Sequence, residues 1–260
     1  MSRLELEIPL HLRRGNLKQD EDAYVESGVK LLALMASRFG LDGLGNSRIL
    51  DIGCGTKFTQ AILSRNIPIA RYVGIDVYAE MIQFLRESVG DSRFSFHHID
   101  LHNEMYNAGG QPLADTRELP ISETDFDIIC LFSVFTHLAP HDYAPMLKLL
   151  RNYIHPQGKL IFSLFVHELT PGGYGCMDGI MKALVAKDAS LQEKQRASLE
   201  EAGRNQGPPD FVDVYPKQPL KVAMYSRKYA LELMENTGWK VDSLNDPERI
   251  VEHYMICSPA

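Results

Sequence analysis

Cysteine, tryptophan and net positive charge are all scarce in this sequence. Its 260 residues include 4 cysteines and 1 tryptophan, and the formal net charge is −7. The cysteines lie far apart and form no CxxC pair, which favours reduced thiols over a disulfide framework or a zinc site. The acidic balance, with a pI near 5.7, argues against a nucleic-acid partner, because attraction to phosphates needs clustered lysine and arginine.

Long hydrophobic runs are missing as well. Residues 1–16 alternate apolar and charged side chains, and no later segment approaches the ~20 apolar residues that span a bilayer. We therefore expect a soluble, unexported, cytoplasmic protein without a membrane partner. The composition, 45% hydrophobic and 23% charged residues, is that of an ordinary globular protein.

An alternation of β-rich runs and helical patterns stands out between residues 48 and 165. It predicts a mostly parallel sheet with helices on both faces. The predicted strands are short apolar runs, as expected for strands buried on both faces; they span residues 48–52, 72–76, 94–100, 127–133, 159–165, 239–244 and 253–257. The predicted helices span residues 20–39, 59–64, 79–87, 143–154 and 226–237.

A glycine-rich turn follows the first predicted strand, in the run Asp51-Ile-Gly53-Cys54-Gly55-Thr56. Glycines there let the backbone approach a ligand closely. A dinucleotide site would continue as G-x-G-x-x-G or G-x-G-x-x-A, but the third residue after Gly55 is Phe58. Asp51 would repel a pyrophosphate and attract a cation, and S-adenosylmethionine carries both an ammonium and a sulfonium.

Two more acids end the next two predicted strands. Asp76 lies about 20 residues after the glycines, at the distance where a carboxylate accepts both ribose hydroxyls. Asp100 ends the following strand, where it could accept from an adenine amino group. Three acids at three successive strand ends form a compound signal for a nucleoside-containing cation.

At this point the sequence resembles the class I S-adenosylmethionine-dependent methyltransferases, over residues 48–165 and again over 225–257. The matching motifs are Leu50 to Thr56, Val73-Gly74-Ile75-Asp76, Asp100, Phe126 to Leu138, and Leu150 to Leu160. The resemblance implies S-adenosylmethionine as cofactor, with S-adenosylhomocysteine as product. It assigns Asp51, Gly53 and Gly55 to the methionine end, Asp76 to the ribose, Asp100, Leu101 and Tyr78 to the adenine, and Phe132 with Ser133 to the neighbourhood of the methyl group. Cys54 and Val77 are further residues that the resemblance implies for cofactor binding.

The sequence departs from that family in one position and lacks one of its motifs. Lys57 replaces a third glycine, so the loop either lies further from the cofactor or places an ammonium near the acceptor pocket. The Asn-Pro-Pro-Tyr motif that holds planar nitrogens in amine methyltransferases is absent after the fourth strand. An oxygen acceptor is therefore the better hypothesis.

His137 is the candidate general base, because it follows the fourth strand, where acceptors of this family lie, and a neutral imidazole can take a hydroxyl proton. The alternative for His137 is packing at a helix N-terminus. His141 would share its helix face, but Pro140 intervenes; Asp142 is expected to cap the helix. His167 is a weaker base candidate.

A cluster of histidines surrounds Asp100 and resembles a set of metal ligands. After His97, three of its residues would share one face of an extended strand: His98, Asp100 and His102. Because Asp100 has a better use, we expect no metal. Tyr174, Tyr215 and Tyr225 are expected either to pack or to contact substrate, and residues 182–201 to form a solvated helical face.

These observations predict an α/β, Rossmann-like, seven-stranded sheet with its last strand antiparallel and a helical lid inserted after the fifth strand. We expect one domain over residues 1–260: a helical cap (1–47), a cofactor-binding core (48–165), a lid (166–222) and a closing helix with a β-hairpin (223–260). The predicted function is O-methylation of a small molecule such as a sugar or secondary metabolite. A protein or lipid methyltransferase, or a non-catalytic cofactor-binding partner subunit, are the alternatives, and a homodimer is compatible with the sequence.

Overall fold

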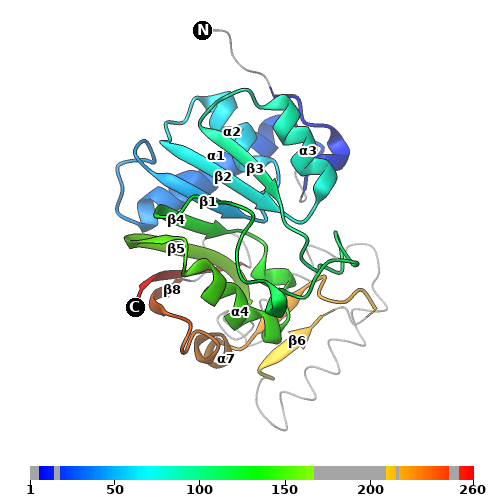
Figure 1. Cartoon of the computed structure of the whole chain (residues 1–260), viewed down its shortest axis with the longest axis vertical. Coiled ribbons are helices and arrows are strands. Elements are labelled where there is room, and N and C mark those ends of the chain that lie inside the picture. Colours follow the sequence, from blue (N-terminus) through cyan, green and yellow to red (C-terminus); the bar gives the residue numbers. More distant parts are fainter. Residues whose placement is uncertain (1–5, 15–17, 167–208, 215–216, 246–251) are drawn as a thin grey trace. The chain divides into compact units, whose positions relative to one another are not determined.

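Parallel strands build the first part of the chain (Figure 1). The structure is a computed structural model that describes residues 6–14, 18–166, 209–214, 217–245 and 252–260. It divides into two compact units, the first made of Met1–Phe132 and Asn152–Ile161, the second of Ser133–Arg151 and Phe162–Ala260. Strand β5 (Ile154–Val166) runs through both units.

The sheet of the first unit has the strand order β3-β2-β1-β4-β5. Strand β1 pairs in parallel with β2 on one side and with β4 on the other, and β2 pairs in parallel with β3. The direction of winding therefore changes at β1, and in sheets of this kind ligands bind outside the carboxyl ends of the strands at such a point. The bounds are β1 (Arg48–Ile52), β2 (Arg71–Asp76), β3 (Phe94–His98) and β4 (Phe126–Leu131).

Helices α1 (Glu21–Arg38), α2 (Lys57–Arg65) and α3 (Ala79–Ser88) belong to the same unit. Helix α1 begins where the Asp20 side chain accepts a 3.0 Å hydrogen bond from the N–H group of Ala23. It packs tightly on α2 at Gly28, where a Cβ atom would lie only 2.9 Å from the Cβ atom of Ala61. This contact holds α1 beside the turn that follows β1.

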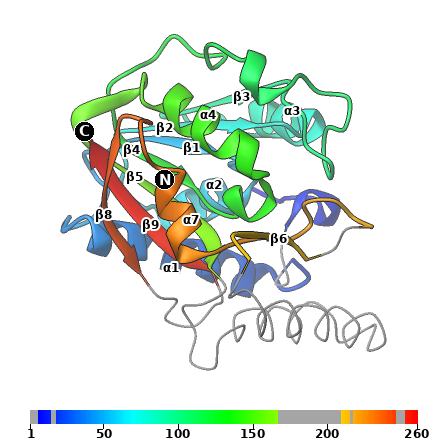
Figure 2. The ribbon, with the colours of Figure 1, turned by 90° about the horizontal axis from the view of Figure 1, so that it is seen from below.

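Antiparallel strands close the second unit (Figure 2). Strand β8 (Trp239–Asn245) pairs with β9 (His253–Pro259), and β9 pairs with β5. Two further short strands, β6 (Phe211–Asp213) and β7 (Ala223–Tyr225), join the end of β5, with β7 parallel to it. The mostly parallel α/β fold with antiparallel last strands is confirmed, but the described part of the sheet has nine strands, not seven. Three-residue strands are too short to show a periodic pattern in sequence.

Several element bounds differ from the prediction. Strand β3 ends at His98, so Asp100 lies in a loop, and β5 begins five residues earlier than predicted, at Ile154. Helices α4 (Pro140–Leu150) and α7 (Arg227–Glu232) are shorter at their carboxyl ends. Residues 167–208, most of the predicted lid, lie outside the described residues, and the division into four segments stays a prediction. None of the described helices has the length and hydropathy that crossing a bilayer requires.

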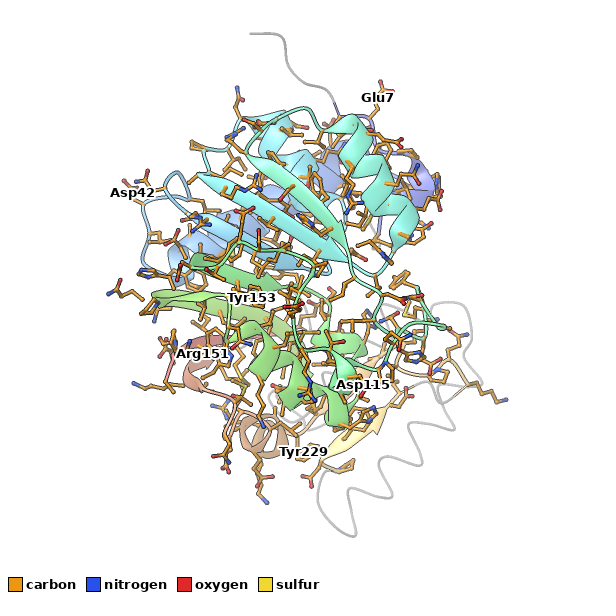
Figure 3. The ribbon with its side chains drawn as sticks, viewed as in Figure 1. Glu7, Asp42, Asp115, Arg151, Tyr153 and Tyr229 are labelled. Atoms are coloured by element: carbon orange, nitrogen blue, oxygen red, sulfur yellow. The ribbon has the colours of Figure 1, made fainter. Side chains whose placement is uncertain are left out.

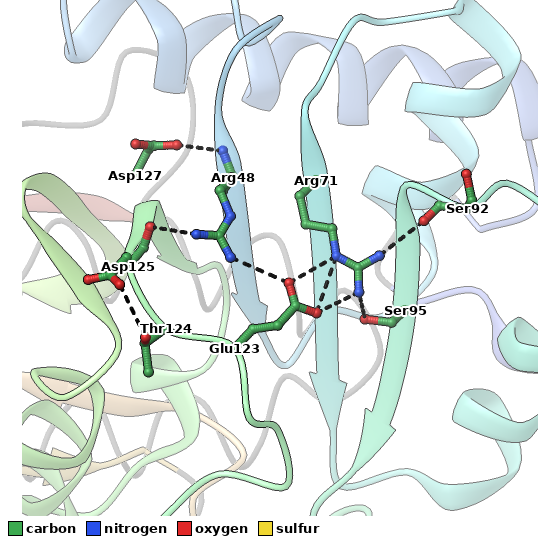
Figure 4. A network of polar contacts seen from close by, with 8 residues as sticks. All are labelled: Arg48, Arg71, Ser92, Ser95, Glu123, Thr124, Asp125 and Asp127. Atoms are coloured by element: carbon green, nitrogen blue, oxygen red, sulfur yellow. Dashed lines mark hydrogen bonds and ion pairs between the residues drawn. The ribbon is translucent and has the colours of Figure 1, made fainter.

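The amino ends of β1 and β2 are joined by ion pairs (Figure 4). The Glu123 carboxylate accepts hydrogen bonds from two guanidinium nitrogens of Arg71, at 2.6 Å and 3.1 Å. The guanidinium of Arg48 lies 3.5 Å from the same carboxylate. Tyr153, labelled in Figure 3, fixes the segment that precedes β4, because its hydroxyl accepts from the Leu119 N–H group at 2.7 Å. These contacts stabilise the end of the sheet opposite the predicted site.

Candidate active site

The turn after β1 is shaped by two glycines in left-handed backbone conformations. Gly53 has φ 68° and Gly55 has φ 51°, a region that costs little only for glycine. The N–H group of Gly53 donates a 2.8 Å hydrogen bond to the Ile75 carbonyl, which ties the turn to the end of β2. Helix α2 begins at Lys57, directly after the turn. The turn thus lies at the carboxyl end of the sheet, where ligands of such folds bind.

Asp76, the last residue of β2, connects this turn to the start of α3. Its Oδ2 atom accepts from the N–H group of Gly55 at 3.1 Å, and its Oδ1 atom accepts from that of Tyr78 at 3.0 Å. Burial raises the pKa of Asp76, while these two N–H groups and that of Val77 act in the opposite direction. Both oxygens keep a further lone pair, so the carboxylate retains the capacity to accept from two neighbouring hydroxyls.

Asp51 is placed differently, inside the sheet layer and not at its edge. Only 2% of the residue is exposed, and its Oδ2 atom accepts a 2.5 Å hydrogen bond from the Tyr72 hydroxyl. Burial raises the pKa of Asp51 to about 7, although hydrogen bonds from Tyr72 and Cys130 lower it. Its partners in the structure are therefore protein groups, and its contact with the methionine end stays a prediction.

Cys54 packs beneath the same turn. Its sulfur lies where a Cβ atom on Gly74 would be only 2.9 Å away, so β2 needs a glycine at this position. The thiol is buried, and burial raises its pKa well above the usual value. Cys54 is therefore a protonated packing residue, and any contact with a cofactor would come from its backbone.

Asp100 lies in the loop after β3, close to Asp76 through the backbone. The Ile99 N–H group donates to the Asp76 carbonyl at 3.1 Å, and the exposed Asp100 carboxylate accepts from the Asn107 side chain at 2.9 Å. Leu101 is buried beside it. The structure therefore places the backbone just before the third predicted acid beside that of the second, at the carboxyl end of β2.

The nearby histidines have local partners. His98 Nε2 lies 3.2 Å from the Val77 carbonyl, and His102 Nδ1 lies 3.0 Å from the Ala108 carbonyl. Because β3 ends at His98, the predicted common strand face of 98, 100 and 102 does not form. Burial lowers the pKa of His97. Among the described residues, no group of three His, Cys, Asp or Glu side chains could hold a metal ion.

Three residues form an aromatic and cationic cluster beside Asp76, and two of them were not predicted. The rings of Tyr78 and Tyr106 lie 6.3 Å apart between centroids. The Arg14 guanidinium carbon lies 4.8 Å from the Tyr78 centroid and 5.0 Å from that of Tyr106. The resemblance to the methyltransferase family implied Tyr78, whereas Arg14 and Tyr106 are distant in the chain and carry no motif.

Helix α1 contributes Tyr24, another residue without a sequence signal. Its hydroxyl lies 3.0 Å from the Thr56 hydroxyl, at the end of the glycine turn. The ammonium of Lys57 lies 5.3 Å from the Tyr24 ring centroid. Lys57 is thus the first residue of α2, and its charge lies over an aromatic face. A tyrosine on a helix that precedes the sheet gives no motif from which this contact could be predicted.

Phe132 follows β4 and packs on the start of α2. Its ring meets that of Phe58 edge-on, with 5.3 Å between the centroids. Phe58 is the bulky residue that departs from the dinucleotide pattern, and it is buried. The ring of Phe132 therefore has an apolar partner at the start of α2, and its place near the cofactor's methyl group stays a prediction.

Ser133 begins the second unit with a strained backbone. Its φ is 57°, uncommon for a residue with a side chain. Its N–H group donates to the Ser163 hydroxyl at 2.7 Å, and its own hydroxyl donates to Glu252 at 3.0 Å. Strain of this kind is often found at functional sites, where surrounding contacts hold it.

His137 ends the short 3-10 helix Phe135–His137 of the second unit. Its Nδ1 atom lies 3.1 Å from the Leu220 carbonyl. A carbonyl accepts only, so Nδ1 carries the proton and Nε2 carries the lone pair when the ring is neutral. Burial lowers the pKa of His137. Hydrogen bonds to the backbone of Leu220 and Lys221 and the negative charge of Glu252 raise it, but their effect is smaller. The imidazole is therefore neutral at pH 7.

His141 does not share a helix face with His137, as the proline between them suggested. Helix α4 begins at Pro140, after the 3-10 helix has ended. The N-cap residue is Ala139 without a side-chain cap, so Asp142 is a first-turn residue and not the predicted cap. It lies 3.4 Å from the exposed His141 ring.

Tyr225 has a packing role. Its hydroxyl donates to the Leu138 carbonyl at 2.5 Å, and its ring packs against those of Phe211 and Tyr143. The remaining candidates of the predicted lid lie outside the described residues; they are His167, Tyr174, Tyr215 and the segment 182–201.

Comparison with known proteins identifies this fold. Residues 50–162 match the family model described as "Methyltransferase domain". The chain is 27% identical over 143 residues to a malonyl-[acyl-carrier protein] O-methyltransferase of Acetivibrio thermocellus, covering 50% of this chain and 50% of that protein. The chain thus spans about half the length of this curated relative.

Two solved structures share the architecture over nearly the whole chain. The PH0226 protein of Pyrococcus horikoshii is 16% identical with a TM-score of 0.55, and covers 93% of both chains. The magnesium protoporphyrin IX methyltransferase of Synechocystis, solved with bound S-adenosylhomocysteine, is 12% identical with a TM-score of 0.51, and covers 99% of this chain and 92% of that one. At such low identities these likenesses establish the fold.

Proposed function

We propose that this chain, which carries a methyltransferase domain of the class I S-adenosylmethionine-dependent type, methylates a hydroxyl oxygen of a small molecule. The observation that carries the proposal is the position of Asp76. Its carboxylate is held by the N–H groups of Gly55 and Tyr78 at the carboxyl end of β2. A nucleoside is the ligand class for which that geometry is suited.

The residues around this carboxylate fit S-adenosylmethionine. Asp76 would accept from the ribose hydroxyls, Tyr78 and Leu101 would flank the adenine, and Asp100 would accept from its amino group. The glycine turn would hold the methionine end through the backbone of Gly53 to Gly55, since Asp51 is occupied by Tyr72. When bound, the cofactor supplies a methyl group that its sulfonium already activates.

The chain itself must then hold the acceptor, exclude water and remove one proton. His137 is suited to the last task because it is neutral at pH 7 and its Nδ1–H is directed to the Leu220 carbonyl. His137 Nε2 would take the proton of the acceptor hydroxyl as its oxygen gains the methyl group, and the cofactor would be left as S-adenosylhomocysteine.

A carboxylate acceptor is the second candidate, and the relative from Acetivibrio thermocellus favours it. Its name describes O-methylation of a malonyl group on an acyl-carrier protein. A carboxylate is ionised at neutral pH and needs no base, whereas an alcohol must lose its proton. The two acceptor classes therefore differ in their requirement for His137.

A paired substrate test separates these candidates. His137→Gln, which keeps a donor for the Leu220 carbonyl, should lower kcat for hydroxyl acceptors by about 10²- to 10⁴-fold, because it removes general-base catalysis. The wild-type rate should rise with pH to a plateau below pH 7, since the pKa of His137 is lowered. The measurement is S-adenosylhomocysteine release with panels of alcohols and of acyl carboxylates, and His141→Gln is the matched control.

Full activity of His137→Gln toward an alcohol would contradict the base assignment. Turnover of carboxylates only, unchanged by His137→Gln, would support the second candidate. The partner expectations belong to the same proposal: a small-molecule acceptor, no nucleic acid, no membrane, a cytoplasmic location, and a homodimer as the compatible oligomer.

A further inference from the structure

We propose that Arg14 and Tyr106, together with Tyr78, form a clamp on the adenosine half of the cofactor. The inference rests on the proposed function, and deepens it by naming two cofactor-positioning residues that no motif indicates. It also assigns a role to the segment before α1, here called the N-terminal strap (residues 6–14), which Figure 1 shows in dark blue beside α3.

The N-terminal strap is fixed to the body of the first unit. Its apolar residues Leu6, Ile8 and Leu12 are buried. Arg13, only 9% exposed, donates to the Ile8 carbonyl at 3.1 Å and pairs with Glu21 at 2.8 Å. A segment held at these points places its last described residue, Arg14, in a defined position.

The strap also reaches α2 and α3, the helices that follow β1 and β2. Gln60 of α2 donates to the Leu6 carbonyl at 3.3 Å. His11 lies 3.0 Å from Glu80, and Glu80 in turn accepts a 2.6 Å hydrogen bond from the Tyr78 hydroxyl. The strap therefore contacts both helices that start at the predicted cofactor loops, and it does so through side chains that reach Tyr78.

Tyr106 is held at the opposite side of the cluster by its own loop. Its N–H group donates to the Asn103 side chain at 3.1 Å, and 37% of the residue is exposed. An exposed aromatic ring beside a second ring and a guanidinium offers flat faces to a ligand. The guanidinium carbon and the two ring centroids lie 4.8 to 6.3 Å from one another. The planes of the two rings are tilted by 36°.

Charge in the cluster favours a neutral ring over a phosphate. Arg14 opposes the rise in the pKa of Asp76 that burial causes, so it helps to keep that carboxylate ionised as a hydroxyl acceptor. Asp76 and Glu80 both lie near the guanidinium, and their negative charges would repel a phosphate. An uncharged purine with a ribose, as in adenosine, matches the combination of flat faces and a carboxylate acceptor.

Binding of two probes tests this inference directly. S-adenosylhomocysteine and 5′-methylthioadenosine share the adenosine half, but the second lacks the amino acid. Both probes are titrated by isothermal calorimetry into wild type, Arg14→Gln, Tyr106→Ala and Tyr106→Phe. We expect Arg14→Gln and Tyr106→Ala to bind both probes about tenfold more weakly than wild type. Tyr106→Phe keeps the ring and should bind with near-normal affinity. Arg65→Gln, an exposed arginine in the last turn of α2, is the matched control.

Three results would overturn the clamp. Unchanged affinity in Arg14→Gln and Tyr106→Ala would show that neither residue contacts the site. A loss with S-adenosylhomocysteine alone would place Arg14 at the amino acid half, and tighter binding in Arg14→Gln would show that the strap blocks the site. Wild-type protein that binds neither probe would refute the proposed function itself, so the two failures are distinguishable.

Kinetics separate positioning from general stability. Arg14→Gln should raise the KM for S-adenosylmethionine about tenfold and leave the KM of the acceptor unchanged. Equal changes in both constants, with a lowered Tm, would indicate a structural role and contradict the inference.

Discussion

The two ends of strands β1 and β2 carry charge in opposite ways. At the amino ends, Glu123 pairs with Arg71 and Arg48, and the Arg71 hydrogen bonds lower its pKa. At the carboxyl ends, burial raises the pKa of both Asp51 and Asp76. Within the described residues neither aspartate has an ion pair, and their hydrogen bonds come from N–H, O–H and S–H groups.

This difference indicates that the two ends of the same strands have different roles. Charges at the amino ends are neutralised within the protein, so they contribute to stability alone. Acids at the carboxyl ends form no ion pair among the described residues, although Arg14 lies near enough to Asp76 to lower its pKa; their burial costs stability, and Asp76 keeps acceptor capacity for a ligand. Perturbed acids of this kind mark candidate functional sites.

Asp51→Asn should give the largest change in stability. Because the pKa of Asp51 is raised from 3.8 to about 7, the folded state binds its proton more tightly than the unfolded chain does. The stability that this proton provides is present below pH 4 and is lost as the pH rises to 7, by up to about 4 kcal/mol. Asparagine still accepts from Tyr72 but does not ionise.

Urea unfolding of wild type and Asp51→Asn at several pH values checks this prediction. The free energy of unfolding of the variant, relative to wild type, should increase between pH 4 and pH 7. A constant difference across that range would mean that Asp51 has an ordinary pKa in the folded protein.

Glu123→Gln should have a smaller effect, of about 1 kcal/mol, because 32% of the Glu123 side chain is exposed and solvent screens its ion pairs. Its lowered pKa means that the stabilisation is present above pH 4.5 and is lost as the pH falls through the folded-state pKa. Thermal unfolding at pH 7 and pH 3, with the exposed Glu118→Gln as control, measures it. Equal Tm values for wild type and Glu123→Gln at pH 7 would argue against a stabilising network.

Much of the fold could be predicted because buried parallel strands are short apolar runs with clear boundaries. The strands β1, β2 and β4 and the helix α1 appear within two residues of their predicted positions. Strand β5 was predicted too short, since Pro156 to Gly158 signal a turn in sequence but lie within an extended strand. Strands β6 and β7 depend on pairing with distant residues and leave no local pattern.

The candidate site was predictable where a motif ties it to a strand end. Gly53, Gly55, Asp76 and Tyr78 fall in two successive strand-to-helix turns, and the structure joins them through hydrogen bonds. Three further residues lie near these two turns but come from other elements, so only the tertiary structure reveals them; they are Arg14, Tyr24 and Tyr106. The burial of Asp51 likewise depends on Tyr72 and Cys130 in neighbouring strands.

Titration of S-adenosylhomocysteine into wild type, Asp76→Asn and Glu123→Gln tests the central claim most directly. The account predicts that wild type and Glu123→Gln bind with similar affinity, whereas Asp76→Asn binds about 100-fold more weakly because hydrogen bonds to a charged acceptor are lost. Asparagine leaves one of the N–H groups of Gly55 and Tyr78 without an acceptor, so the Tm of Asp76→Asn should fall, and the titration is made well below that Tm, where the variant is folded. Equal binding by all three proteins, or loss of binding only in Glu123→Gln, would contradict the assignment of the carboxyl ends as the cofactor site.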